Sequence, residues 1–172
     1  MQTLDGVKNI LFTVSHILEV IAKWAIVVCL LVMFGVTFLQ VIARYIFHYS
    51  FFWVEEVAIF AMAWLTFLGA SIAIRRKEML SFEFLKSLFP RPVRAVVGIL
   101  GYIMMIFFLT WVIVYGFKLA VVNLTHISPA LTIPMTYPYL SVPIGGIFLL
   151  VQTCVLLLLS VFDLASRQEE KK

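Results

Sequence analysis

The positions of the charged residues constrain the fold of this chain more than any other feature. Residues 24–43, 57–74 and 95–117 form runs of 20, 18 and 23 residues without Asp, Glu, Lys or Arg, and residues 119–162 form a run of 44. A helix of about 20 mostly apolar residues crosses a hydrocarbon core about 30 Å thick. Because backbone groups in lipid must be bonded within their own segment, such runs cross a membrane as helices.

The longest run divides into a turn-rich part and an apolar part. Asn123 and the prolines Pro129, Pro134 and Pro138 favour turns in its first half. The chain is 63% hydrophobic and 13% charged, whereas soluble domains are about 45–50% apolar and about 25% charged. We therefore predict an all-α membrane protein with one domain, residues 1–172, and four transmembrane helices at residues 24–47, 54–74, 95–120 and 139–163.

The Lys and Arg residues indicate the orientation of these spans. Cytoplasmic segments of multi-pass proteins carry an excess of both residue types. If the N-terminus is inside, the same side holds residues 75–94, the C-terminus and eleven of the 13 Lys and Arg residues, while Arg44 and Lys118 lie on the other side. This distribution predicts that both ends are cytoplasmic, an N-in/C-in topology.

Two further segments have the spacing of amphipathic helices. Residues 7–22 place apolar side chains at i, i+3, i+4 and i+7, with Lys8, His16 and Glu19 elsewhere on the helical wheel. Residues 78–89 form a shorter and less regular pattern. We predict that both segments lie along the cytoplasmic membrane surface, the first either separate from the first span or continuous with it.

The densest group of polar and aromatic residues lies between the first two spans. Gln40 and Arg44 share a helix face, and Glu55 and Glu56 begin the second span, where the helix dipole stabilises carboxylates. Either Arg44 pairs with a glutamate across the turn, or it extends to the membrane surface within an ordinary aromatic belt. The candidates for structural or subunit-interface residues here and in the second span are Gln40, Arg44, Tyr45, Trp53, Glu55, Glu56, Trp64, Gly69, Arg75 and Arg76.

Small residues in the second span allow another helix to approach closely. Gly69, Ser71 and Ala73 occur along its second half, and Gly98 and Gly101 occupy the third span. Such residues serve close helix packing, either within one chain or against another subunit. The spacing alone leaves both interpretations open.

Residues suited to catalysis or cofactor binding are poorly placed for either. His16, His48 and His126 lie outside the span centres, so they form no facing pair for haem and no metal-ligand spacing. Cys29 and Cys154 lie within apolar runs, as buried apolar residues do. We predict no enzymatic activity, no cofactor, no metal site and no nucleic-acid partner, with membrane lipids as neighbours.

The centres of the predicted spans contain no Asp, Glu, Lys, Arg or His. Ion-coupled carriers usually place ionisable residues or broken helices at the membrane midplane. We therefore expect no substrate-binding residues in this chain. An anchor subunit of a larger membrane complex fits better, and a self-sufficient four-helix exporter is the weaker alternative.

Four stretches carry a likeness to a known family: Gln40-Val-Ile-Ala-Arg44-Tyr-Ile-Phe, Trp53-Val-Glu55-Glu56, Trp64-Leu-Thr-Phe-Leu-Gly69-Ala and Arg75-Arg76. In this combination the chain resembles the small permease (Q) subunits of tripartite ATP-independent periplasmic (TRAP) transporters. The strongest likeness lies in residues 40–77, and the four-span layout agrees over nearly the whole chain. Family proteins often have a histidine soon after the arginines of the second span, whereas this chain has Lys77-Glu78-Met79 there.

The resemblance implies partners rather than an activity of the chain itself. In this family the small subunit forms a heterodimer with a large permease subunit, which carries the sodium and substrate sites. A soluble periplasmic substrate-binding protein delivers an organic acid, with sialic acid favoured here over a C4-dicarboxylate. The implied role is a scaffold for secondary active, sodium-coupled uptake in the bacterial inner membrane.

Overall fold

The computed structural model describes residues 2–76 and 91–169. Four of the helices are long and apolar enough to cross a membrane, and the described residues form no strand beyond an isolated bridge between Ile127 and Pro134. The prediction of an all-α protein with four membrane-spanning helices is therefore confirmed. The helices are α1 (Gln2–Ile46), α2 (Trp53–Arg75), α4 (Arg91–Val122), α5 (Thr136–Tyr139) and α6 (Ser141–Glu169).

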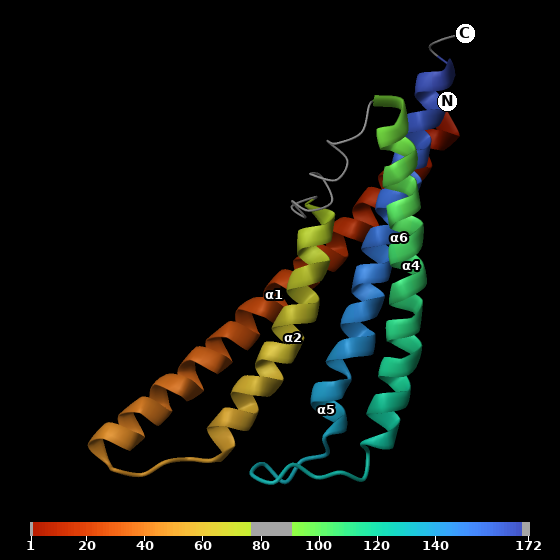
Figure 1. The fold of residues 1–172 in the computed structure, drawn as a ribbon. Helices are drawn as coiled ribbons and strands as arrows, with labels where there is room; N and C mark the ends of the chain where they lie inside the picture. The colour runs from red at the N-terminus through yellow and green to blue at the C-terminus, as the bar shows by residue number, and fades with distance from the viewer. Residues whose placement is uncertain (1, 77–90, 170–172) are drawn as a thin grey trace.

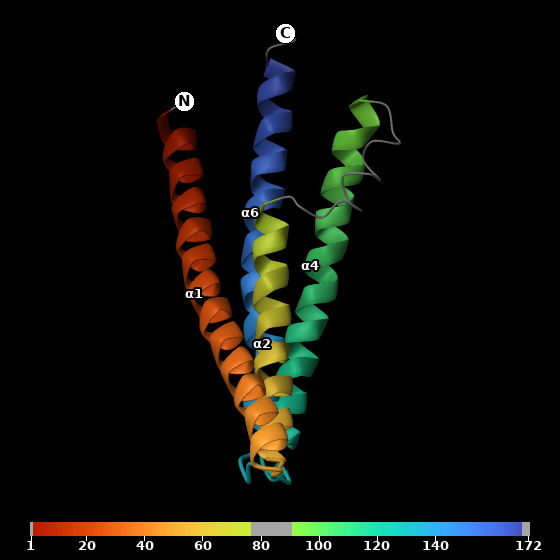
Figure 2. The same cartoon turned by 90° about the vertical axis from the view of Figure 1, so that its left-hand side faces the viewer.

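Helices α2 and α6 form the centre of the bundle, with α1 and α4 on either side (Figures 1 and 2). Helix α6 contacts α1, α2 and α4, whereas α1 and α4 do not touch each other within the described ranges. Both termini lie at one end of the bundle, here called the terminal end, and residues 47–52 and 123–135 lie at the other, the loop end. The arrangement puts both termini on one side of a membrane, and which side is cytoplasmic stays a prediction.

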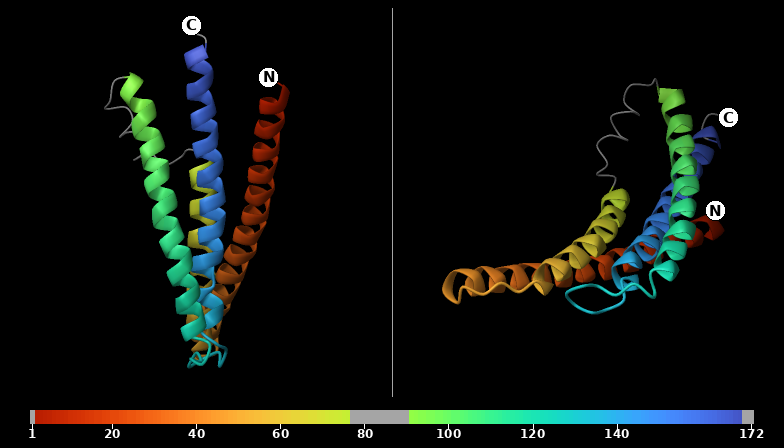
Figure 3. Two further views of the ribbon diagram at one scale, coloured as in Figure 1. Left: turned by 90° about the vertical axis from the view of Figure 1, so that its right-hand side faces the viewer. Right: turned by 60° about the horizontal axis from the view of Figure 1, so that its bottom comes forward.

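Residues 7–22 and the predicted first span belong to one helix of 45 residues that continues through Lys23. Helix α1 is inclined to α4 and α6, which Figure 3 shows from two further sides. In residues 7–22, Ile10, Ile17 and Ile21 are more than half exposed, whereas Ser15 and Glu19 are buried against the bundle. The apolar face of this segment is thus turned outward. Its placement along the membrane surface stays a prediction, and residues 78–89 lie outside the described ranges.

Two adjacent glycines let α6 pack closely against both of its main neighbours. A Cβ atom on Gly145 would lie 2.3 Å from the Cβ of Phe67 on α2, and one on Gly146 would lie 2.9 Å from Cγ1 of Ile113 on α4. Non-bonded carbon atoms do not come this close, so larger residues would force the helices apart.

The buried apolar cluster consists of Ile74, Tyr102, Leu109, Leu149 and Leu156.

The outer surfaces of the bundle are strongly apolar. No residue is buried in the most apolar 18-residue stretch of α1, and large side chains such as Phe34 and Phe107 are about two-thirds exposed. Water-soluble monomers rarely expose apolar patches larger than a few hundred Å². Because these surfaces extend over helices of membrane-spanning length, the chain is a multi-pass membrane protein.

Candidate functional site

The carboxylate of Glu56, in the first turn of α2, is held by the connection between α4 and α5. Its oxygens accept hydrogen bonds from the hydroxyl of Ser128 and from the backbone N–H groups of Ala130 and Leu131, at 3.1 and 3.0 Å. The positive end of the helix dipole favours a carboxylate at this position. Glu56 therefore fixes the start of α2 to a segment that is distant in sequence.

The bound segment has a defined backbone conformation of its own. The N–H of Ser128 donates to the carbonyl of Ile133 at 2.9 Å, and the N–H of Met135 donates to the carbonyl of His126 at 2.8 Å. Thr132 has a φ of 55°, the left-handed conformation that reverses the chain between these paired positions. The connection is thus an ordered hairpin-like turn, and Glu56 binds its inner amides.

Arg44 and Glu55 do not take part in this contact. Arg44, in the last turn of α1, is exposed, and among the described residues no ion pair joins it to Glu55 or Glu56. Of the two interpretations of Arg44, the structure favours extension away from the bundle. Glu55 is also exposed, so the two adjacent glutamates have different environments.

Aromatic side chains lie beside this polar contact at the loop end. The Phe51 ring lies 5.0 Å from the ring of Tyr49 and 5.8 Å from that of Trp53, between ring centroids. A groove of about 630 Å³ runs beside them to Glu56, Pro129 and other residues of the turn. Tyr45 is 77% exposed on the last turn of α1. The loop end therefore combines one fixed carboxylate with an uncovered aromatic surface.

A second polar cluster lies toward the terminal end, where α1 crosses the end of α2. The carboxylate of Glu19 forms ion pairs with Arg75 and, at 2.6 Å, with Lys23, and one of its oxygens lies 3.5 Å from Arg76 Nε. Nη1 of Arg75 also lies 3.5 Å from Nδ1 of His16. Arg75 and Arg76, predicted as interface candidates, are thus joined to α1 of the same chain.

One turn away, a reciprocal pair of hydrogen bonds joins α1 to α6. The hydroxyl of Ser15 donates to Oε1 of Gln152 at 2.5 Å, and Nε2 of Gln152 donates to the carbonyl of Ser15 at 3.0 Å. Both residues are almost fully buried. An amide inside a membrane protein needs such partners, because lipid offers none.

The remaining candidates lie on partly covered surfaces. Gln40 and Trp64 are half-buried. A Cβ atom on Gly69 would meet nothing within 4 Å, so this glycine does not serve close packing inside the chain. Of the two interpretations of the small residues in α2, packing within the chain therefore fails at Gly69. Its open position leaves room for something outside this chain.

The arrangement provides structural contacts rather than the parts of a reactive centre. Glu19 and Glu56 each have several hydrogen-bond or charge partners, and the described residues hold no group of three His, Cys, Asp or Glu side chains near one another. The fold and these contacts define a helical multi-pass membrane protein whose polar side chains fix its helices to one another.

Comparison with known proteins gives the family. Residues 33–163 match the family model described as "Tripartite ATP-independent periplasmic transporters, DctQ component". The chain therefore belongs to the DctQ family of TRAP transporter components, as its sequence motifs predicted. It is also 34% identical over 61 residues to the sialic acid TRAP transporter permease protein SiaT of Haemophilus influenzae (strain 86-028NP). The match covers 36% of this chain and 10% of that relative, so the chain spans a small part of the relative's length.

Several residues of these contacts were not singled out from the sequence. Apart from its position before Pro129, nothing in the sequence marks Ser128 as a structural residue. Its hydrogen bond to Glu56 depends on the tertiary fold. Glu19 and Lys23 are four residues apart, a spacing typical of a helical ion pair. Gln152, an amide within an apolar span, is the clearest signal, because such residues usually bond to a neighbouring helix.

Proposed function

We propose that this chain is the small membrane subunit of a sodium-coupled TRAP transporter in the bacterial inner membrane. It scaffolds a large permease subunit, as a heterodimer, for uptake of an organic acid that a periplasmic substrate-binding protein delivers. The observation that carries this proposal is the match of residues 33–163 to the DctQ family. Because the centres of the spans carry no charged residue, this chain is better suited to a scaffold role than to ion coordination.

The outward face of α2 is the surface that we assign to the large subunit. Ile59 and Met62 are more than 60% exposed, Thr66 is exposed on the same side, and Gly69 follows with open space above it. Small residues permit a second helix to come within close packing distance in a membrane. Helix α2 itself lies between α1 and α4 in this view, and those two helices do not touch each other within the described ranges (Figure 2).

The other interface candidates lie mainly toward the loop end. Gln40, Arg44 and Tyr45 lie on the last two turns of α1, and Trp53 and Glu55 lie at the start of α2. We propose that they extend the contact surface toward the partners, while Glu56 keeps the neighbouring turn in place. The sodium ion and the substrate bind to the large subunit in this proposal, and this chain carries no cofactor.

For the substrate we propose sialic acid, with a C4-dicarboxylate as the alternative. Support comes from the relative named above, whose name specifies sialic acid and to which 61 residues of this chain are 34% identical. No side chain of this chain is assigned to the substrate. The choice between the two acids therefore has to be made on the assembled transporter.

Reconstituted uptake tests the proposal. Proteoliposomes would contain the chain alone, the large subunit alone, or both, with an inward sodium gradient and the binding protein loaded with radiolabelled sialic acid. We expect uptake only with both membrane subunits, and only while the sodium gradient lasts. Uptake by this chain alone, or equal uptake by the large subunit alone, contradicts the scaffold role.

Two substitutions at the loop end sharpen this test. Arg44→Ala and Glu56→Ala should lower recovery of the large subunit in co-purification, or lower uptake at equal recovery. Thr110→Ala is the matched control, because the Thr110 hydroxyl donates only within its own helix, to the carbonyl of Ile106 at 2.8 Å. Wild-type assembly and uptake in both loop-end variants would remove these residues from the interface.

A further inference from the structure

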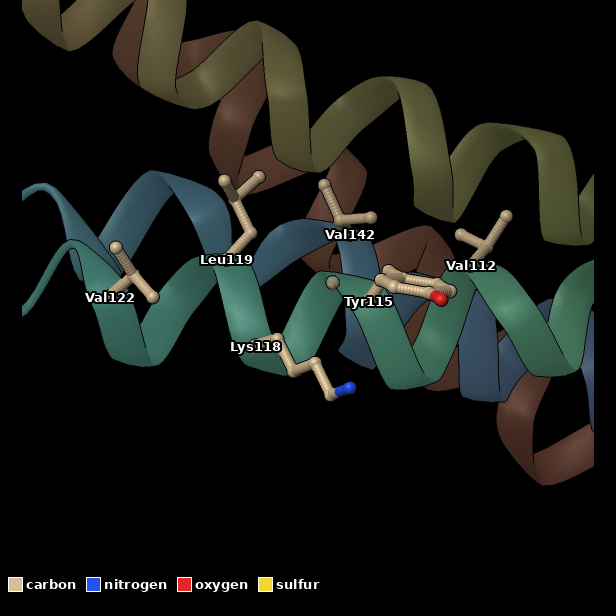
Figure 4. Close-up of a pocket in the computed structure, with 7 residues that line it drawn as sticks. Val112, Tyr115, Lys118, Leu119, Val122 and Val142 are labelled. Atoms are coloured by element: carbon tan, nitrogen blue, oxygen red, sulfur yellow. The ribbon is translucent and has the colours of Figure 1, made fainter.

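A groove of about 550 Å³ lies where α4 packs against the start of α6, toward the loop end (Figure 4). Only two of the side chains along it carry polar atoms, the ammonium of Lys118 and the hydroxyl of Tyr115. The rest of the wall is aliphatic. The groove is lined by Val112, Tyr115, Gly116, Lys118, Leu119, Val122 and Val142.

The floor of this groove is formed by a close approach of the two helices. A Cβ atom on Gly116 would lie 3.1 Å from both Cδ of Pro143 and Cγ1 of Val142. The absence of a side chain at Gly116 therefore brings α6 against the backbone of α4. Tyr115 and Leu119, one turn apart on α4, line the groove beside this approach.

Lys118 places one positive charge beside this apolar channel. Its Nζ atom lies 5.2 Å from the centroid of the Tyr115 ring, and Tyr115 stacks on Trp111 at 5.4 Å. The Lys118 side chain turns back along α4 toward Tyr115 rather than toward the helix end (Figure 4). Lys118 and Tyr115 thus both line the groove, with the ammonium beside the tyrosine ring.

No carboxylate of the described chain neutralises this ammonium. Among the described residues Lys118 forms no ion pair, and residues 119–162, which include α5 and the first part of α6, contain no charged residue. Glu56, at the same end of the bundle, is occupied by Ser128, Ala130 and Leu131. An unpaired ammonium beside lipid is costly, so an anion from outside the chain is its natural partner.

The position of Lys118 along α4 indicates which kind of anion it binds. It lies four residues before the end of α4 at Val122, about 6 Å along the helix axis. Trp and Tyr residues are enriched at the depth of lipid headgroups, and Tyr115 lies three residues before Lys118. We propose that this groove binds one phospholipid, whose phosphate accepts hydrogen bonds from Lys118 and Tyr115 and whose acyl chain lies against Val112, Leu119, Val122 and Val142.

Native mass spectrometry of the full-length chain in mild detergent tests the proposal. The delipidated protein would be titrated with phosphatidylglycerol, with diacylglycerol of matched acyl chains, and with glycerol phosphate. We expect one phosphatidylglycerol to be retained about tenfold more strongly than either other compound, because each lacks one half of the contact. Equal retention of diacylglycerol, or full competition by glycerol phosphate, overturns the proposal.

Matched variants separate the two halves of the site. Lys118→Ala should lower phosphatidylglycerol retention about tenfold, Lys118→Arg should keep it, and Arg44→Ala should leave it unchanged, since Arg44 does not line this groove. Leu119→Gln should weaken the binding of both phosphatidylglycerol and diacylglycerol. Val121 is exposed outside the groove, so Val121→Gln should weaken the binding of neither. Wild-type retention by Lys118→Ala, or an equal loss in Arg44→Ala, overturns the proposal.

A protein partner at this site gives a different result. If Lys118→Glu releases the large subunit while phosphatidylglycerol still binds as in the wild type, Lys118 faces a carboxylate of that subunit, and the lipid site is wrong. If phosphatidylglycerol is lost and the heterodimer still assembles, the site is a lipid site. Size-exclusion chromatography confirms that each variant is folded before titration.

Discussion

Glu56 accepts a hydrogen bond from Ser128, a residue 72 positions further along the chain. The same carboxylate accepts the N–H groups of Ala130 and Leu131. The contact joins the first turn of α2 to the connection between α4 and α5, so it links the two halves of the bundle at the loop end. Removing it should loosen the turn without disturbing the helices.

The first prediction follows from these bonds. Glu56→Gln replaces a charged acceptor by a neutral amide, which accepts more weakly and adds two donors with no partner in the turn. Amide hydrogen exchange at Ala130 and Leu131 should become roughly tenfold faster, as measured by mass spectrometry on the purified chain.

Glu55→Gln is the matched control for this measurement. Glu55 is adjacent in sequence, carries the same charge and is exposed, and among the described residues it forms no hydrogen bond to the turn. In the Glu55→Gln variant, the rate of amide hydrogen exchange at Ala130 and Leu131 should equal that of the wild type. Equal acceleration in both variants would mean that net charge, rather than the Glu56 contact, orders the turn.

The fold followed from the sequence because its main determinant is local. A helix across lipid needs only a long run of apolar residues, and residues 57–74 and 95–117 show such runs directly. The continuity of α1 through Lys23 was harder to predict, because a charge near a span usually indicates its end. In the structure Lys23 is paired with Glu19 on the preceding turn, so the helix continues.

The polar contacts were only partly predictable, because each depends on which helices become neighbours. Glu56 and Arg75 were predicted as structural or interface residues, but their partners were not. Arg44 is the cation nearest to Glu56 in sequence, yet among the described residues it forms no ion pair with Glu56. The actual partner of Glu56 is a serine in a distant turn. A partner of that kind has no periodicity or spacing by which a sequence reveals it.

A second prediction contrasts two glycines. Gly145→Leu places a side chain where even a Cβ atom would lie 2.3 Å from Phe67, so α2 and α6 must separate. Overpacking of this kind costs about 1–3 kcal/mol. The midpoint of thermal unfolding of the purified chain should fall accordingly.

Gly69→Leu should behave differently, because the space above Gly69 is open in this chain. The isolated variant should unfold at the wild-type temperature or slightly above it, since leucine favours helix more than glycine does. In co-purification it should recover less of the large subunit, because the side chain would fill the proposed contact face. Full recovery with wild-type uptake would place that subunit on another face.

A third prediction concerns the reciprocal pair of Ser15 and Gln152. Hydrogen bonds between membrane helices contribute about 0.6 kcal/mol on average and at most about 1.7. Ser15→Ala should therefore cost about 0.6 kcal/mol, and Gln152→Leu, which loses both bonds, somewhat more. The double variant should cost little more than Gln152→Leu alone, as measured by reversible unfolding in detergent mixtures.

Thr13→Ala provides the control for that cycle. The Thr13 hydroxyl donates to the carbonyl of Asn9 within α1, at 2.8 Å, and the residue is exposed. Its removal should leave stability within about 0.5 kcal/mol of the wild type. Additive costs of Ser15→Ala and Gln152→Leu would show that the two residues act independently, contrary to the geometry.

The fourth prediction concerns the ion pair between Glu19 and Arg75, whose side chains are 9% and 13% exposed. Removing one partner of a buried pair leaves the other charge without compensation, which costs about 3 kcal/mol. Glu19→Gln should destabilise the purified chain by about that amount, and Arg75→Gln by less, because Lys23 and Arg76 still face the Glu19 carboxylate. The double variant should cost clearly less than the sum, because neither charge is then left alone.

Lys23→Gln separates this pair from the rest of the cluster. The Lys23 side chain is 43% exposed, so its ion pair with Glu19 is screened by solvent and salt. Its loss should cost less than about 1 kcal/mol, and the difference from wild type should shrink in high salt, whereas the cost of Glu19→Gln should persist. If Lys23→Gln is as harmful as Glu19→Gln, the buried pair is not what holds α1 to α2, and the exposed cations carry that contact instead.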